Sequence, residues 1–528
     1  MRAACILTLF FFLCISCRNT VGDKEKMAYV NADTSHLKNE IHNIDSLLLA
    51  GNRPLLSFYR AKGFKTVWAD TANRQALHTA IESIGADGLL PKDYNLTEII
   101  AFENDRDITA EEVVAYDILL TKSFRKLATH LFKGKLKPSS LYYDWALAPK
   151  KFEPNTLLEE GLEHGTIADV LARCRPVHPI YSGLRESLAW LNTLPDDSEL
   201  PKISISGTLK RGDTGDAVQA VQQRLVYWGD MDAAQTADSI YGTGTIKAVA
   251  RFQKRHGMYP SGIVDKRTAE VLNATREERK GQVIANMERW RWFAYDFGEK
   301  AIVINIPDYS LSVIEEGKDT VQTFKVVVGK PDRRTPILYS RLNNLVFNPT
   351  WTIPPTILKE DLVPEATEDR SYFENYRLTI YYGNDTIPTA AEDWDPQIAD
   401  HYRYVQRPGR DNSLGLVKFN FRNGYYVYLH DTNHRELFAR SYRALSSGCV
   451  RVEDPMKLAA YVLEKEEKDW NADKMQELIA LGETKNVGLS KSTHVHQLYW
   501  TAWTAKGGLQ FRDDIYNLDK ALYNKLRK

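Results

Sequence analysis

The sequence lacks an excess of charge of either sign, and this absence limits its partners. Its 69 Lys and Arg residues balance 69 Asp and Glu residues, so the formal net charge is zero. Binding to the phosphates of DNA or RNA needs a basic excess or a basic patch, so composition predicts no nucleic-acid partner. The 528 residues are 43% hydrophobic and 26% charged, as is typical of a folded chain with several domains.

Long apolar runs are also scarce. The run Ile6–Ser16 (ILTLFFFLCIS) is shorter than the roughly 20 residues that span a bilayer, so it indicates a signal peptide. It ends at Cys17, and this junction resembles a bacterial lipobox, with cysteine where that pattern usually has leucine. We predict a signal peptide over 1–17, lipidation at Cys17 and an exported, periplasmic protein tethered to the membrane by lipid. Plain secretion and an uncleaved anchor are the alternatives.

Cysteine is rare, with five in the chain. Cys5 and Cys14 would leave with the signal peptide, and Cys17 would carry lipid. An oxidising compartment permits pairing of the remaining two, Cys174 and Cys449. They lie far apart in the sequence, and a large domain needs no covalent staple. We therefore expect both thiols to be free, and Cys449 is either a packing residue or a nucleophile.

Hydrophobic periodicity divides the chain into an α+β multidomain protein. Asp117–Gly134 has apolar residues at helical spacing, whereas the segment KAIVINIPDYSLSVIEEGK alternates as strands do. The predicted units are a tether at 18–45, a helical scaffold domain at 46–204, a three-helix module at 205–275, a mostly-β domain at 285–485, and C-terminal strands and a helix at 486–528 that pack on the scaffold or the β domain. An insertion at about 360–410 is polar, aromatic and irregular, which favours a functional lid.

The module at 205–275 contains the same turn–helix pattern twice. A glycine turn is followed by a short amphipathic helix in LKRGDTGDAVQAVQQRL and again in YGTGTIKAVARFQKRHGM. Asp216 and Gln219 have the spacing of a capping box. These phrases, with SGIVDKRTAEVLN, resemble the peptidoglycan-binding domain 1 family, which implies peptidoglycan as a partner. A helical spacer that has lost binding is the alternative.

The stretch YVYLH ends at His430, and RALSSGCVRV contains Cys449. A nucleophilic thiol needs a base or a helix N-terminus to form the thiolate, and His430 is a candidate base at a strand end. Gly448 allows close backbone approach, so N–H groups of Gly448 and Cys449 are candidates for an oxyanion hole. From the residues alone, Cys449 is as well explained by core packing, His434 is a rival base in an exposed loop, and Arg451 is equally a solvated charge.

A family resemblance favours the nucleophile. The two stretches resemble the signature of the YkuD-type L,D-transpeptidases, a histidine followed within twenty residues by Ser/Thr-x-Gly-Cys-x-Arg/Asn. The matching residues here are His430, Ser446, Gly448, Cys449 and Arg451. Ser447 departs from the pattern, since many members have histidine there. The order of helical scaffold, peptidoglycan-binding module and catalytic domain is similar to the large YcbB-like architecture.

This resemblance implies a mechanism and assigns roles. Cys449 attacks the third residue of a donor tetrapeptide stem, His430 moves the proton, and the Gly448 backbone holds the oxyanion. D-Alanine leaves, and an amine of a second stem resolves the thioester to a 3→3 cross-link. Asp431 and Thr432 are expected to orient His430. Substrate contacts are expected from Arg451, Ser446, Ser447 and Arg443.

The resemblance also sets expectations about ligands and alternatives. No cofactor or metal is expected, and a carbapenem-type β-lactam is expected to add covalently at Cys449. Hydrolysis by an L,D-carboxypeptidase or anchoring of a protein to the wall would use the same acyl-enzyme. A wall-binding scaffold with an inert Cys449 is the non-catalytic alternative.

Overall fold

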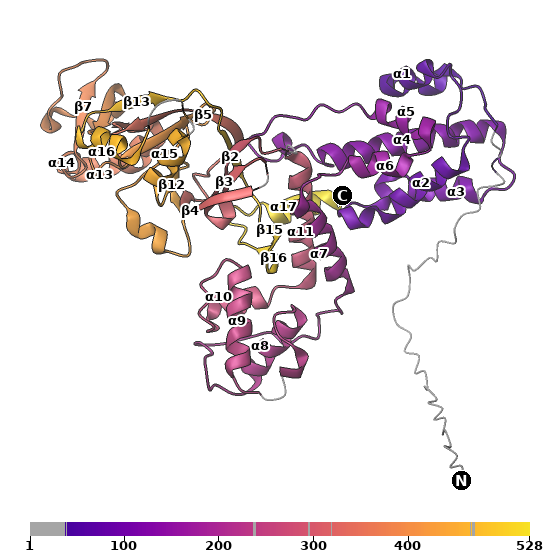
Figure 1. Ribbon diagram of the computed structural model, residues 1–528, viewed down its shortest axis with the longest axis horizontal. Coiled ribbons are helices and arrows are strands. Elements are labelled where there is room, and N and C mark those ends of the chain that lie inside the picture. The colour runs from indigo at the N-terminus through magenta and orange to yellow at the C-terminus, as the bar shows by residue number, and fades with distance from the viewer. Residues whose placement is uncertain are drawn as a thin grey trace, which may run out of the picture.

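The computed structural model describes Leu37 and residues 40–235, 239–293, 296–317, 319–464, 466 and 470–528. The predicted signal peptide, the lipidation site Cys17 and most of the tether lie outside the described residues. Figure 1 shows a helical region at one end, a small helical module below, and a β-rich domain at the other end. The α+β multidomain fold class is thereby confirmed. No helix in the described ranges combines the length and apolarity needed to cross a membrane.

The N-terminal helical region has its own hydrophobic core. Leu55, Leu77, Phe124, Leu127 and other buried side chains form one continuous cluster, as the helical spacing of the sequence predicts. Its helices are α1 (Arg53–Ala61), α2 (Thr71–Glu82), α3 (Leu96–Asn104), α4 (Ala110–Lys133), α5 (Pro154–His164) and α6 (Ile167–Arg173).

The small module is built from α8 (Asp216–Tyr227), α9 (Thr243–Arg255) and α10 (Lys266–Leu272). Val218, Leu225 and Phe252 are fully buried between the helices. The capping-box prediction at Asp216 is wrong, because α8 begins at Asp216 and its N-cap is Gly215, whose φ of 105° suits glycine.

Helix α11 (Arg276–Trp292) lies where the three parts meet (Figure 1). It packs against α7 (Pro179–Thr193), α17 (Asp519–Leu526) and the hairpin β15 (Ala502–Ala505) and β16 (Gly508–Phe511). Trp290 stacks on Trp500 with ring centroids 4.3 Å apart, and Arg289 Nη1 donates to Asp519 at 2.5 Å. Thus α7 and the C-terminal segment pack on α11, where the helical region, the small module and the β domain meet.

The β domain is an 11-stranded sheet whose path closes on itself, because β5 pairs with both β14 and β9. The strands along it are β1 (Trp145–Ala146), β5 (Ile337–Phe347), β14 (His494–Leu498), β2 (Lys300–Asn305), β3 (Ser310–Glu315), β4 (Asp319–Gly329), β12 (Val450–Val452), β10 (Leu429–His430) and β9 (Val417–Phe421), with β11 (Ala444–Ser446) beside β4 and β13 (Lys485–Gly488) beside β5. Helices α15 (Pro455–Glu464) and α16 (Ala472–Ala480) follow β12. Strand β14 lies in the middle of this sheet, although the sequence pattern places it in the C-terminal unit.

The insertion is a folded unit, so the expectation of irregular structure is wrong. Its three-stranded sheet consists of β6 (Trp351–Thr352), β8 (Tyr402–Gln406) and β7 (Leu378–Tyr382). Short helices α12 (Pro355–Ile357), α13 (Val363–Glu368) and α14 (Tyr372–Asn375) flank a π-helical turn at Leu358–Leu362. Leu362, Phe373 and Tyr404 belong to a separate small core. The insertion therefore has a small hydrophobic core of its own.

Candidate active site

Cys449 lies in the tight turn between β11 and β12. Gly448 has φ of 111°, which L side chains rarely adopt. Ser446 Oγ donates to the Cys449 carbonyl at 2.6 Å and accepts from the Gly448 N–H at 3.2 Å, while Thr335 Oγ1 donates to the Gly448 carbonyl at 2.9 Å. The Gly448 N–H is therefore engaged, whereas the Cys449 N–H has no hydrogen-bond partner in the described part of the chain. Of the two N–H groups in this turn, that of Cys449 is therefore the better candidate for an oxyanion donor.

His430 ends β10, the strand next to β12, and pairs in register with Arg451. Its Nδ1 donates to the Asp431 carbonyl at 2.5 Å, which leaves Nε2 as the acceptor. Burial, the Arg451 charge and the Lys418 charge lower the pKa of His430 to about 3. The imidazole is thus neutral near pH 7, oriented by the backbone, and able to accept a proton.

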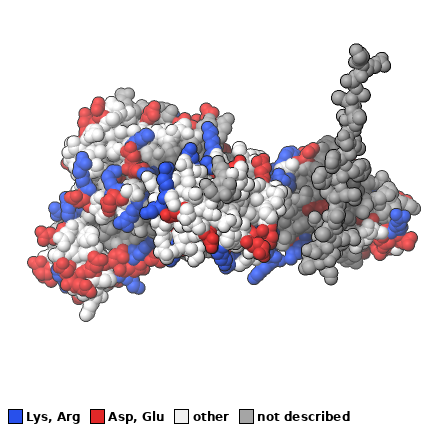
Figure 2. Space-filling model, turned by 90° about the horizontal axis from the view of Figure 1, so that it is seen from below, with Lys and Arg blue, Asp and Glu red and all other residues white. Residues whose placement is uncertain are grey.

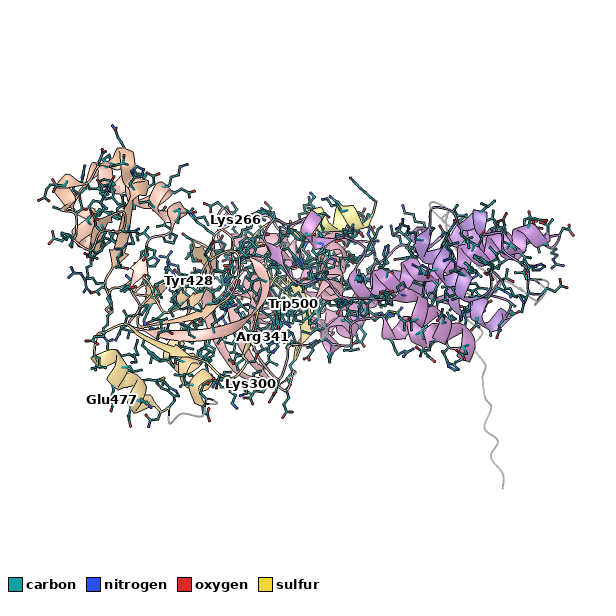
Figure 3. The ribbon with its side chains drawn as sticks, turned by 90° about the horizontal axis from the view of Figure 1, so that it is seen from above. Lys266, Lys300, Arg341, Tyr428, Glu477 and Trp500 are labelled. Atoms are coloured by element: carbon teal, nitrogen blue, oxygen red, sulfur yellow. The ribbon has the colours of Figure 1, made fainter. Side chains whose placement is uncertain are left out.

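The Cys449 thiol contacts Tyr428, two residues before His430 on the same strand. Both the backbone N–H and the phenol O–H of Tyr428 donate to Sγ, and the Trp351 indole donates to the phenol oxygen. His430 is not a hydrogen-bond partner of the thiol in the described chain, but its ring packs against the Tyr428 ring with centroids 5.6 Å apart. In Figure 3, Tyr428 lies in the β domain toward the insertion and away from the helical region.

Two cations flank the thiol. The Lys418 ammonium lies 3.8 Å from the Tyr428 ring centroid, and Lys418 pairs with His430 across β9 and β10. Burial raises the pKa of Cys449, whereas the Tyr428 hydrogen bonds and the charges of Lys418 and Arg451 lower it. The balance is a neutral thiol at rest, with donors and cations positioned to stabilise a thiolate once it forms.

The predicted orienting residues act in different ways. Asp431 holds His430 through its carbonyl, while its carboxylate accepts from the Leu416 N–H at 2.9 Å and from Arg435 at 2.7 Å. Thr432 Oγ1 accepts from the His434 N–H at 3.1 Å, so it shapes the loop, and no hydrogen bond joins it to His430 in the described part of the chain. The His434 side chain is 55% exposed, which makes it a poor candidate for the base.

The two predicted carboxylate-binding arginines also differ. Arg443 donates to the carbonyls of Val326, Arg440 and Tyr309 at 3.1, 2.8 and 3.2 Å, so its guanidinium is committed to the fold. Arg451 is half-buried opposite His430, and its Nε has no partner in the described chain. Of the two, Arg451 is the one placed beside the catalytic candidates.

Sequence reasoning missed Tyr428, Trp351, Lys418 and Arg333. The period-2 alternation of YVYLH places Tyr428 on the same face as His430, and this signal was sufficient to find it. The other three come from distant segments that only the fold brings to the turn. Arg333 Nη1 donates to Ser447 Oγ at 3.0 Å. Ser447, the residue that departs from the family pattern, thus has a hydrogen-bond partner.

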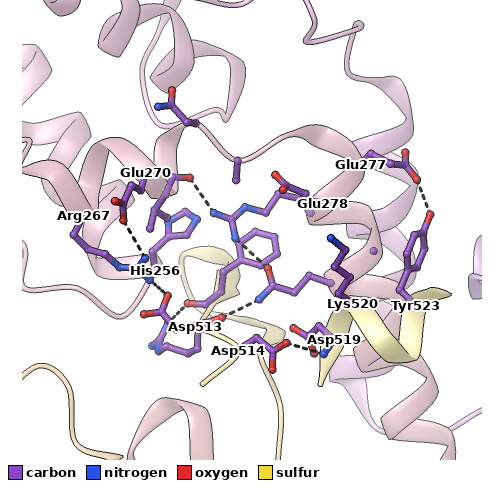
Figure 4. Close-up of a pocket in the computed structure, with 18 of the residues that line it drawn as sticks. His256, Arg267, Glu270, Glu277, Glu278, Asp513, Asp514, Asp519, Lys520 and Tyr523 are labelled. Atoms are coloured by element: carbon purple, nitrogen blue, oxygen red, sulfur yellow. Dashed lines mark hydrogen bonds and ion pairs between the residues drawn. The ribbon is translucent and has the colours of Figure 1, made fainter. Parts of the chain in front are cut away.

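A separate pocket of about 650 Å³ lies between α10, α11, α17 and the C-terminal hairpin (Figure 4). Its charged side chains largely satisfy one another: Arg267 pairs with Asp513, and the Tyr523 hydroxyl donates to Glu277 at 2.6 Å. None of the predicted catalytic residues lines it. Basic and acidic side chains are interspersed on the face in Figure 2, in keeping with the balanced composition. The described residues contain no cluster of metal-ligating side chains.

Three family models match separate parts of the chain. The model described as "L,D-transpeptidase catalytic domain", YkuD, matches residues 299–475. The model described as "Putative peptidoglycan binding domain" matches 214–272, and a "Scaffold domain" matches 53–188. These ranges contain Cys449 and His430, the three-helix module and the helical region, respectively.

The chain is also similar to individual proteins. It is 38% identical over 224 residues to a Haemophilus influenzae protein named "Putative L,D-transpeptidase", a match that covers 42% of this chain and 45% of that protein. The chain thus spans about half the length of this curated relative. Crystal structures of L,D-transpeptidases from Xylanimonas cellulosilytica and Stackebrandtia nassauensis are 18% and 13% identical, with TM-scores of 0.17 and 0.20. Each match covers 56% of this chain, and 99% and 96% of those structures.

Proposed function

Starting from the YkuD-type L,D-transpeptidase catalytic domain that this chain contains, we propose that the protein joins peptidoglycan stem peptides through 3→3 cross-links. The observation that carries the proposal is the half-buried Cys449 next to the strand that ends at an oriented, neutral His430. The neighbouring peptidoglycan-binding domain supports the polymer as substrate.

In the first step, Cys449 attacks the carbonyl of the third residue of a donor tetrapeptide. His430 Nε2 takes the thiol proton, after which the Tyr428 O–H and the Lys418 charge stabilise the thiolate. The Cys449 N–H donates to the tetrahedral oxyanion. The bond to the terminal D-alanine nitrogen breaks, His430 returns the proton to this amine, and a thioester remains.

In the second step, the amine of a neighbouring stem attacks the thioester. His430 takes the amine proton and passes it to the departing Cys449 sulfur. The product is an amide between two third residues, and the free thiol is restored. Water as acceptor would make the protein a carboxypeptidase, and a protein amine would make it a wall-anchoring enzyme.

Incubation with purified tetrapeptide muropeptides, followed by mass spectrometry, tests the proposal. Cross-linked dimers with loss of one D-alanine per dimer are the expected products. Tripeptide products without dimers would indicate that water is the acceptor and that the protein is a carboxypeptidase. Unchanged substrate would favour the non-catalytic scaffold. A carbapenem is expected to form a covalent adduct on the native protein and none on Cys449→Ala.

We also propose that the protein is exported and lipidated. The cell-wall domains support export, and the N-terminal sequence supports lipidation at Cys17. Mass analysis of the mature N-terminal peptide tests this, because an N-terminal Cys17 with a diacylglycerol adduct is expected. An unmodified N-terminus would contradict it.

A further inference from the structure

Arg333 lies in the loop between β4 and β5 and connects the insertion to the nucleophile turn. Its Nη1 and Nη2 donate to the two Asp361 carboxylate oxygens at 2.7 and 2.8 Å. Its Nε donates to Glu360 at 2.8 Å, and Nη1 also donates to Ser447 Oγ at 3.0 Å. The guanidinium is therefore saturated, with two carboxylates on one side and the turn of Cys449 on the other.

The ion pairs have the geometry of a binding site. A planar guanidinium that holds a carboxylate through two parallel bonds is the usual arrangement for carboxylate recognition. The Arg333 side chain is only 8% exposed, whereas those of Glu360 and Asp361 are 50% and 39% exposed. The Arg333 guanidinium is thus buried in the protein surface, and its two carboxylate partners lie on its solvent-exposed side. Both partners belong to the π-helical turn of the insertion, a distortion that is frequent at functional sites.

We propose that Arg333 binds the C-terminal carboxylate of the donor stem peptide, and that Asp361 and Glu360 occupy this site when no donor is bound. The inference rests on the proposed function, because it assigns a substrate contact to the same site. In a tetrapeptide donor, a single residue separates the attacked carbonyl from the terminal carboxylate, a span of about 3.8 Å between equivalent atoms. Arg333 bonds to a residue two positions from Cys449, which suits this short reach.

The other arginines nearby fit this role less well. Arg443 is held by three backbone carbonyls. Arg451 pairs in register with His430 and lowers its pKa. Arg334 follows Arg333 directly, but its guanidinium donates to the carbonyls of Pro331 and Tyr516. Within the described ranges, Arg333 is the one of these four that holds side-chain carboxylates, which an incoming carboxylate can replace.

Exchange of partners would couple recognition to the insertion. A donor carboxylate on Arg333 releases Glu360 and Asp361, and with them the π-helical turn. A donor without a free carboxylate cannot compete for the cation. The arrangement therefore selects donors with a free terminal carboxylate and frees the insertion only when one is bound.

Two donors test the inference, a tetrapeptide muropeptide with a free C-terminal carboxylate and its C-terminal amide. Acyl-enzyme formation on the full chain is followed by intact mass. The native protein should prefer the acid. Arg333→Gln should lower kcat/KM for the acid about 100-fold, since a buried charge partner is lost, and should change the amide less than about threefold. Arg334→Gln is the matched control and should keep the preference.

The double variant Glu360→Gln with Asp361→Asn separates recognition from simple bracing. Removal of the internal competitor should raise kcat/KM for the acid by about three- to tenfold, because more of the protein is then competent to bind. If the ion pairs only hold the insertion in place, this variant and Arg333→Gln will both slow the reaction, and that result would overturn the proposal. Equal loss on acid and amide in Arg333→Gln would also overturn it.

Binding to Cys449→Ala distinguishes this inference from the proposed function. Calorimetry should show about tenfold tighter binding of the acid than of the amide, and Arg333→Gln in that background should remove the difference. Equal affinities would refute the carboxylate site even if the native protein forms acyl-enzyme. Preferential binding without any acylation of the native protein would refute the proposed function and leave the site standing.

Discussion

Cys174 lies in the helical region and Cys449 lies in the β domain. Cys174 is 1% exposed in an apolar core, donates to the Val170 carbonyl at 3.3 Å, and burial raises its pKa to about 12. Cys449 is also affected by burial, but Tyr428 and two cations oppose it. The two thiols therefore differ in the donors and charges around them, rather than in burial alone, and this difference favours Cys449 as the candidate nucleophile.

The largest effect should come from removing each sulfur in turn. Cys449→Ala should abolish acyl-enzyme formation, because the nucleophile is gone. Cys174→Ala should keep the activity and lose about 1 kcal/mol of unfolding free energy, as is usual for a small core truncation. Intact-mass acylation assays and thermal denaturation measure both. Residual acylation of Cys449→Ala by a stem peptide would mean that the nucleophile is misassigned.

Removal of the base tests whether donors alone activate Cys449. His430→Ala should slow acylation by about 10²–10⁴-fold, the usual contribution of a general base, without changing the fold. His434→Ala is the matched control and should behave like the native protein in single-turnover acylation. If the His434 variant were the slower of the two, the base would lie in the exposed loop.

Loss of the phenol should make Cys449 more like Cys174. Tyr428→Phe removes an O–H donor to the thiol, so the Cys449 pKa should rise further and alkylation near pH 7 should slow by about tenfold, or roughly 1.4 kcal/mol for a hydrogen bond to a charged group. The pH dependence of iodoacetamide labelling measures this. Tyr425→Phe is the control, and an unchanged profile for Tyr428→Phe would remove the phenol from the site.

The smallest expected effect is a loss of stability in acid, and it should occur in both regions. Burial lowers the pKa of His130 in the helical region and of His496 in the β domain to about 4, from 6.5. The unfolded chain then binds more protons than the folded one as the pH falls below 6.5, so stability decreases. Between pH 7 and 5.5 each histidine should cost about 1 kcal/mol. In His130→Gln, the free energy of unfolding measured by urea titration should depend less steeply on pH. An unchanged dependence on pH would contradict the burial of His130 as a neutral group.

Much of the fold follows from local patterns. The helix that contains Phe124 and Leu127, the strands around Val303 and Val313, and the three-helix module follow from periods of 3.6 and 2.0 residues. Other features do not. Strand β14 joins the middle of the sheet through pairs with β2 and β5, and the insertion has its own core. Pairings across more than a hundred residues carry no periodic signal.

The candidate site also combines features set by local sequence with features set by tertiary structure. The sequence by itself determined the reactive types and their local geometry: a cysteine after a glycine that needs positive φ, a histidine at a strand end, and a tyrosine two residues before it. Tertiary structure alone decided which side chains tune and surround the thiol. Lys418 reaches it through the β9–β10 pair, Trp351 through the first strand of the insertion, and Arg333 through a loop that meets Ser447. The physical reason is that local sequence fixes backbone conformation and the direction of a side chain, whereas charge and hydrogen-bond partners depend on which distant segments the closed sheet brings within about 3 Å of each other.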